Sequence, residues 1–185
     1  MDETIPPDWP TRLLTFWFVD HGRDSWFKGG PAFDDAIRDQ FADWREALRS
    51  QPAETFLTDA DTALAAVLLF DQVPRNIHRG HAEAFATDDH ALAIARAAVA
   101  HGLDSELDTD RALFLYLPFE HSEDIADQRE AVRLIGTLGN DDYTQFAQAH
   151  LAMIDRFGRF PHRNAALGRK DRPGEAEAVA AGGGW

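Results

Sequence analysis

Residues 61–73 read DTALAAVLLFDQV, and this stretch is apolar on all sides when it is drawn as a helix. A helix without a polar face is buried, so this one is predicted to lie at the centre of a helical fold. Its unbroken apolar run, Ala63 to Phe70, is far shorter than the ~20 residues that cross a bilayer. Pro74 is expected to end the helix, because proline lacks an N–H and clashes with the preceding turn.

Further helices are predicted on both sides of this stretch. From Phe33 to Leu48, apolar residues recur every three or four positions, the period of one buried helical face. The other expected helices cover about 10–18, 87–101, 110–117, 122–138, 141–157 and, weakly, 175–181. Residues 26–30 are assigned to a loop, Thr87 and Ser122 to helix caps, and Pro118 to a helix end. No segment alternates like a strand, so the predicted class is all-α, with seven to eight helices and antiparallel neighbours.

Length and composition limit the other possibilities. We expect one all-helical domain over 1–185, with its core at 8–168 and a weakly structured tail at 169–185 that ends in Trp185. The absence of cysteine excludes disulfides, thiolate nucleophiles and zinc–thiolate sites. The net charge of -14 argues against nucleic-acid and anionic-membrane partners. The acidic first residues contain no signal-peptide core, so we expect a soluble, cytoplasmic protein.

Three segments that follow apolar helices combine proline with charged and large apolar residues. They are 71–80 (DQVPRNIHRG), 116–123 (YLPFEHSE) and 156–164 (RFGRFPHRN). Their apolar members need cover, and the charged members then need partners. Residues 156–172 carry a local charge of +5, which leaves -19 for the rest of the chain. One basic region is therefore expected in an acidic protein.

These segments supply the candidate site residues. The candidate catalytic residues are His121, His162, Asp71 and Glu120. The histidines are acid/base candidates, and the carboxylates would orient them. The candidate ligand-binding residues are Gln72, Arg75, Asn76, Arg79, Arg159, Arg163 and Asn164. Arginine forks bind carboxylate or phosphate, and these arginines outnumber the nearby carboxylates, so at least one is expected to bind an anion.

Each candidate also has a structural interpretation. The arginines can form internal ion pairs, and the asparagines can stabilise turns. His150 falls on the buried face of the helix 141–157 and is interpreted as a core residue. Ser122 is interpreted as a helix cap and not a nucleophile, because no Gly-x-Ser-x-Gly motif is present. The histidine spacing matches no metal motif, so neither a metal nor a cofactor is predicted.

The strings DQVPRNIHRG, LYLPFEHSED and RFGRFPHRN, in this order, resemble the signatures of the bacterial family catalogued as domain of unknown function 924. The resemblance runs from about Phe16 to about Gly168. It implies a tetratricopeptide-like arrangement of the helices, and it implies no activity, because the family's function is not established. The chain departs from the family at its C-terminus, where DRPGEAE (171–177) and a glycine run replace a final helix with an aromatic residue.

Three functional hypotheses follow, and the sequence decides neither between them nor whether the protein is an enzyme. The favoured one is a polar pocket at the helix ends that binds a small anionic ligand, with Arg159 and Arg163 holding the anion. The second is a tetratricopeptide-like module that binds an acidic peptide or protein. The third is a set of buried ion pairs that tie helix ends together. The oligomeric state cannot be predicted.

Overall fold

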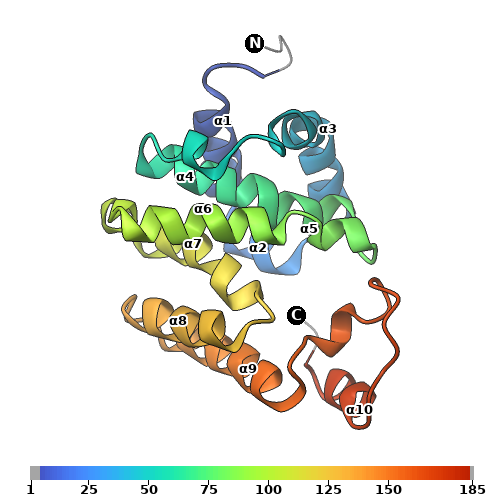
Figure 1. The fold of residues 1–185 in the computed structure, drawn as a ribbon. Helices are drawn as coiled ribbons and strands as arrows, with labels where there is room; N and C mark the ends of the chain where they lie inside the picture. The colour runs from blue at the N-terminus through green and yellow to red at the C-terminus, as the bar shows by residue number, and fades with distance from the viewer. Residues whose placement is uncertain (1–4, 184–185) are drawn as a thin grey trace.

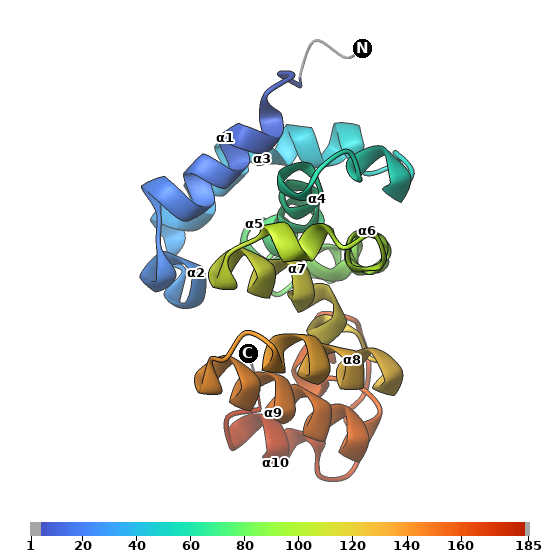
Figure 2. The same cartoon turned by 90° about the vertical axis from the view of Figure 1, so that its left-hand side faces the viewer.

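The chain is all-helical, as predicted. A computed structural model describes residues 5–183, except for the side chains of Phe27 and Lys28, and no strand occurs in that part of the chain. The helices are α1 (Trp9–Thr15), α2 (Arg23–Lys28), α3 (Pro31–Leu48), α4 (Ala60–Val67), α5 (Val73–Ile77), α6 (Asp88–Ala100), α7 (Thr109–His121), α8 (Ile125–Gly136), α9 (Asp141–Phe157) and α10 (Glu175–Ala180). Helices α1–α7 form one part of the molecule, and α8–α10 pack below α7 (Figures 1 and 2).

Helix α4 lies at the centre of the larger part, which confirms the prediction for this stretch. Residues Ala63 to Phe70 have no exposed surface. The neighbours of α4 are α1, α6 and α7. No helix in the described part of the chain is both long and apolar enough to cross a membrane. The tetratricopeptide-like arrangement and the single-domain division remain predictions.

Two short helices were not expected. Helix α2 occupies most of the predicted loop at 26–30. Pro74 does not stop the chain's helical path, because a π-helical segment, Leu68–Gln72, leads from α4 into α5. Pro74 lies in the first turn of α5, directly after the π-helical segment, and the carbonyl oxygen of Phe70, four residues earlier, accepts from the hydroxyl of Thr87.

The end of α7 also differs from the prediction. Pro118 lies inside this helix, which continues to His121. Gln128 of α8 supports the last turn, because its Nε2 donates to the carbonyl oxygens of Glu120 (2.5 Å) and Ser122 (2.7 Å). Ser122 is not the cap of α8; Asp124 is, and it accepts from the backbone N–H of Ala126.

The C-terminal segment contains more contacts than a weakly structured tail would have. Helix α10 begins at Glu175, whose side chain is fully buried. Its carboxylate accepts hydrogen bonds from Arg159, Asn164 and the backbone N–H of Arg172. Trp185 at the predicted end of the tail, and the acidic residues 1–4, lie outside the described residues.

Candidate functional site

Asp71 is placed by the π-helical segment that joins α4 to α5. Such single π-helical turns are frequent at functional sites. The hydroxyl of Thr87 donates to the carbonyl oxygen of Phe70 at 2.6 Å, next to Asp71. Thr87 was predicted to cap α6, but its side chain makes no capping bond and holds this turn instead. Asp71 is thereby fixed in a buried position at the end of the central helix.

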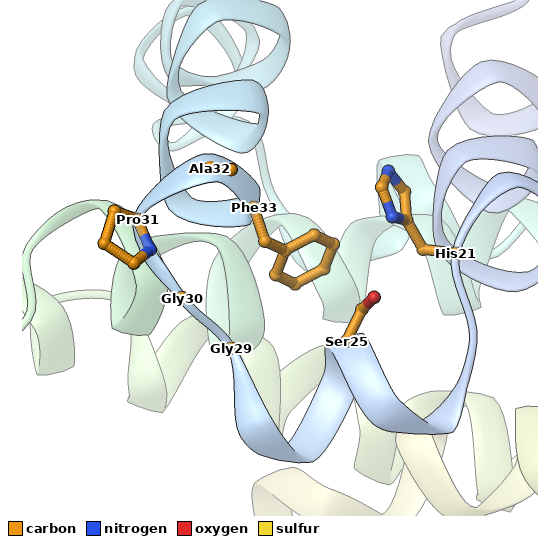
Figure 3. A pocket seen from close by; sticks show the side chains of 7 residues that line it. All are labelled: His21, Ser25, Gly29, Gly30, Pro31, Ala32 and Phe33. Carbon is orange, nitrogen blue, oxygen red and sulfur yellow. The ribbon is translucent and has the colours of Figure 1, made fainter.

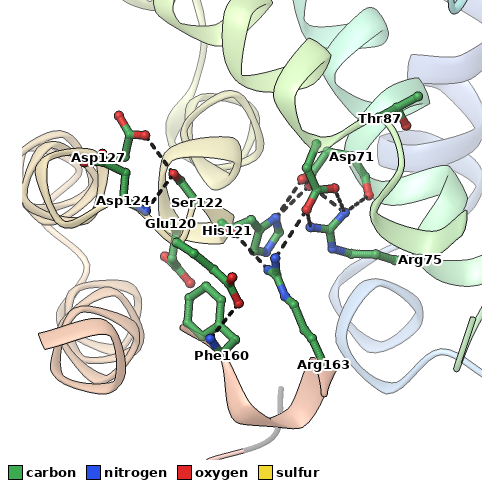
Figure 4. A network of polar contacts seen from close by, with 12 residues as sticks. Asp71, Arg75, Thr87, Glu120, His121, Ser122, Asp124, Asp127, Phe160 and Arg163 are labelled. Carbon is green, nitrogen blue, oxygen red and sulfur yellow. Dashed lines mark hydrogen bonds and ion pairs between the residues drawn. The ribbon is translucent and has the colours of Figure 1, made fainter. Parts of the chain in front are cut away.

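The side chain of Asp71 pairs with His121 at the end of α7 (Figure 4). His121 Nδ1 lies 2.7 and 3.0 Å from the two carboxylate oxygens of Asp71. Gln72 Nε2 donates to the same carboxylate at 2.6 Å. Burial alone would raise the pKa of Asp71, but Arg75 and His121 outweigh it and hold this pKa far below its usual range. Asp71 is therefore an ionised carboxylate that fixes Nδ1 of His121 as the protonated nitrogen.

Two arginines and a second carboxylate complete this group. Arg75 makes a bidentate pair with Asp88, with both N–O distances at 2.9 Å, and lies 3.3 Å from Asp71. Arg163 donates to the carbonyl oxygen of His121 at 2.9 Å and, more weakly, to Asp88 at 3.4 Å. We call Asp71, Arg75, Asp88, His121 and Arg163 the Asp71 cluster. It joins the end of α4 to α5, α6, α7 and the 3-10 turn Pro161–Arg163.

Arg163 is the member of the cluster with a buried nitrogen that donates to no described residue. Its guanidinium lies over the rings of Phe85 and Phe160, 4.8 and 4.6 Å from their centroids. Its Nε is buried and has no hydrogen-bond partner among the described residues. Burial and the nearby charge of Arg75 lower the pKa of Arg163 to about 10. The protein thus retains a buried cation with one nitrogen that no described residue hydrogen-bonds.

A second acid and a second histidine lie beside the cluster. Glu120 is buried, and its carboxyl lies 3.1 Å from Nδ1 of His150, which also contacts the carbonyl oxygen of Phe146 at 2.9 Å. Among the described residues no arginine contacts Glu120. Burial, helped by the charge of Asp71, raises the pKa of Glu120 to about 8. Glu120 is therefore a neutral acid at pH 7 next to the ionised Asp71.

The histidines of this region are neutral at pH 7. Burial lowers the pKa of His150 to about 3 and that of His162 to about 4. Burial also lowers the pKa of His121, although Asp71 opposes the shift. In the part of the chain that the structure describes, no three or more histidine and carboxylate side chains are grouped as metal ligands would be.

Arg159 and Asn164 belong to a different group. Arg159 donates to both oxygens of Glu175, at 2.8 and 2.7 Å, and to the carbonyl oxygen of Lys170. Asn164 donates to Glu175 at 2.9 Å. Arg169 extends the group by pairing with Glu123 at 2.7 Å and with the side-chain oxygen of Asn164. We call Arg159, Asn164, Arg169, Glu123 and Glu175 the C-terminal clamp.

The remaining predicted residues, Arg79 and Asn76, are not members of either group. Arg79 is exposed and pairs with Asp34 of α3 at 3.0 Å. Asn76 donates to the carbonyl oxygen of Gln72, one helical turn before it. This bond stabilises the local backbone, which was the alternative interpretation of this residue. The structure therefore brings together Asp71, Gln72, Arg75, His121 and Arg163, with Glu120 adjacent.

Hollows in the described part of the chain occur away from the Asp71 cluster. One, of about 350 Å³, lies between α2 and the start of α3 and is lined by His21, Ser25 and Phe33 (Figure 3). The other, of about 500 Å³, lies between Trp26 of α2 and Asp108 before α7. Neither is lined by a residue of the Asp71 cluster.

Comparison with known proteins gives a family and no activity. The family described as bacterial protein of unknown function (DUF924) matches residues 13–183. The chain belongs to this family. A solved structure of a protein of unknown function from Agrobacterium tumefaciens is 39% identical, with a TM-score of 0.88, and the match covers 93% of this chain and 97% of that one. No curated protein matches the chain.

This member of the DUF924 family also uses residues that sequence reasoning missed. Asp88 follows Thr87 in the first turn of α6, where an acidic residue is explained by the helix dipole alone. Phe85 contributes a ring to Arg163 from a segment that carries no motif. Glu175 and Arg169 fall in the predicted tail. The sequence offered one signal for these missing partners. Four arginines of the motifs need carboxylates to pair with, and the motifs contain fewer carboxylates than arginines.

Proposed function

We propose that this protein binds a small anionic ligand at the Asp71 cluster, and that His121 is its acid/base group. The observation that carries the proposal is the unused Nε of Arg163, a buried donor without a partner among the described residues. A buried donor left unpaired costs about 1–3 kcal/mol, so a partner from outside the chain is favoured. An oxygen of an anionic ligand suits this donor, because hydrogen bonds between two charged groups are the strongest.

The arrangement of Asp71 and His121 suits acid/base chemistry. Asp71 accepts the Nδ1 proton of His121, and Nε2 has no hydrogen-bond partner among the described residues. A carboxylate that orients a histidine in this way leaves its second nitrogen available as a base. The side chains of Arg75, Asp88 and His121 are partly exposed, and a ligand would approach Arg163 from their side.

The other two hypotheses predict different properties. Among the described residues, the large apolar side chains that are exposed are Val19, Phe146 and Leu167, and they lie in separate segments, which gives no support to a peptide-binding face. A purely structural role is compatible with the ion pairs of Arg75, but it leaves the Nε of Arg163 without a purpose. Ligand binding is therefore the function that the geometry supports best.

A thermal-shift screen with small carboxylates and phosphate esters tests this proposal. A ligand present at 100 times its Kd should raise the Tm of the wild type by about 5 °C. The shift should disappear in Arg163→Lys, which keeps the charge but loses Nε, and in His121→Asn. Arg159→Lys in the C-terminal clamp is the matched control and should keep the shift. If no anion distinguishes the wild type from the two cluster variants, the proposal is wrong.

A further inference from the structure

We infer that the ligand of the Asp71 cluster carries one negative charge on a carboxylate, and that it binds together with a proton taken up by His121. This inference rests on the proposed function and specifies its substrate class and its dependence on pH. It excludes a phosphate dianion as the preferred ligand. Three features of the cluster lead to it: its balance of charges, the two donors of Arg163 and His121 that can face a ligand, and the state of its titratable groups.

The charges of the cluster are already balanced without a ligand. Two carboxylates, Asp71 and Asp88, contact two guanidinium groups, those of Arg75 and Arg163. A carboxylate ligand would add one uncompensated negative charge to a buried site, and a phosphate dianion would add two. Uncompensated charge is strongly disfavoured away from water, so the added charge must be met by a proton. One proton can balance a carboxylate, whereas a dianion would need two.

Two donors of the cluster also match a carboxylate. The terminal nitrogens of Arg75 and Arg163 each donate to Asp88 or to the carbonyl oxygens of Asp71 and His121. Nε of Arg163 is buried and donates to no described residue, and Nε2 of His121 becomes a donor once that ring is protonated. These two donors can meet the two oxygens of a carboxylate.

His121 is the group best placed to receive the proton. The titratable and charged groups that face it are Asp71, Arg75, Glu120, His150, His162 and Arg163. Glu120 already carries its proton at pH 7, and this neutral carboxyl is the one that lies 3.1 Å from Nδ1 of His150. His121 contacts the ionised Asp71 directly, and this contact stabilises the protonated ring. A bound anion would then offset the remaining cost of burying the positive charge.

Isothermal titration calorimetry with acetate and inorganic phosphate tests the inference. The titrations are done at pH 7 in two cationic buffers of different ionisation enthalpy, Tris and bis-Tris, because the difference in heat reports the protons taken up. Acetate should bind with an uptake approaching one proton, and phosphate should bind at least about tenfold more weakly. As the pH rises, the affinity for acetate should fall by up to about tenfold per unit.

Two substitutions identify the group that takes up the proton. His121→Asn keeps a donor for Asp71 but cannot accept a second proton, so acetate binding should weaken and lose its pH dependence. His101→Asn, at an exposed histidine directly after α6, is the matched control and should behave like the wild type. Tighter binding of phosphate than of acetate, or acetate binding without proton uptake, overturns the inference and leaves the proposed function intact. Absence of binding by both probes also overturns it, and the proposed function fails too only if the wider thermal-shift screen finds no ligand.

Discussion

Arg163 and Arg159 come from the same nine-residue motif, yet they have opposite environments. Both are buried, with 6% and 9% of their surface exposed. Arg159 in the C-terminal clamp makes a bidentate pair with Glu175 and a further bond to a carbonyl oxygen. Arg163 in the Asp71 cluster has a carbonyl oxygen, a weak contact with Asp88 and two aromatic rings. Equal burial thus accompanies very different degrees of hydrogen bonding.

The pKa shifts of the two arginines have opposite signs. Hydrogen bonding to Glu175 raises the pKa of Arg159, whereas burial and the charge of Arg75 lower the pKa of Arg163. The clamp stabilises its own charges, and the cluster tolerates a charge that it does not fully stabilise. Sites that bind ligands commonly sacrifice stability in this way. This contrast gives the clamp a structural role and supports the binding role proposed for the cluster.

The largest effect is expected at Arg75, which belongs to the cluster but contributes to stability. Arg75→Met removes the cation between Asp71 and Asp88 and leaves the buried Asp71 and the partly exposed Asp88 without the arginine that they share. Breaking a buried pair in this way costs about 3–5 kcal/mol. Urea denaturation measures the loss. A cost below about 1 kcal/mol would show that the charges of the cluster are less buried than the structure indicates.

The next effect is a dependence of stability on pH that comes from Glu120, which lies beside the Asp71 cluster. The pKa of Glu120 is about 8 in the native state and about 4.5 when unfolded, so between these values only the native state keeps the proton. Stability therefore falls as the pH rises through this window, by at most about 3 kcal/mol between pH 6 and 8. Glu120→Gln should remove this decline in denaturation curves. An unchanged decline in the variant would mean that Glu120 is ionised at pH 7.

Acid should also destabilise the protein, but through histidines. The pKa values of His150 and His162 are about 3 and 4 in the native state, so below about pH 6.5 the unfolded state binds protons that the native state does not. Stability is therefore lost as the pH falls from about 6.5 towards 4. Denaturation at several pH values should give maximum stability near pH 6.5. A maximum below pH 5 would contradict the neutral state of these buried rings.

A smaller effect is expected at Thr87, whose hydroxyl fixes the π-helical segment by its bond to the carbonyl oxygen of Phe70. Thr87→Val preserves shape but leaves the carbonyl oxygen of Phe70 without its donor, at a cost of about 1–3 kcal/mol. Because Asp71 follows directly, NMR signals of the His121 ring should also shift. Thr137→Val, at a hydroxyl that bonds within its own helix end, is the matched control and should leave the His121 signals unchanged. Equal spectra for the wild type and Thr87→Val would show that Thr87 does not position Asp71.

The sequence predicts the parts of this molecule that depend on local pattern. The apolar run around Ala63 identifies the central helix, and the three motifs identify the family and most of the cluster. It does not predict that Pro118 lies within α7, because the support for that last turn comes from Gln128 on the next helix. Contacts between distant segments of this kind leave no local signature.

The assignment of Arg159 and Arg163 to one site fails for a similar reason. The two residues have the same type, the same loop and the same basic surroundings. What separates them is the partner that each one meets, Glu175 in the predicted tail or Asp88 at the start of α6. The local charge of +5 is largely neutralised, since Arg159, Arg163 and Arg169 all contact carboxylates from other segments.

The most direct test of the contrast between clamp and cluster is the free energy of unfolding of Arg159→Met against that of Arg163→Met, from urea denaturation at pH 7. Arg159→Met leaves the buried Glu175 without its cation and should be clearly destabilised. Arg163→Met keeps the contacts with Phe85 and Phe160 and loses one close hydrogen bond, to the carbonyl oxygen of His121, so its loss should be about 1–3 kcal/mol and smaller than that of Arg159→Met. A loss at Arg163 as large as the loss at Arg159 would show that both arginines serve the fold, and would contradict the binding role assigned to the Asp71 cluster.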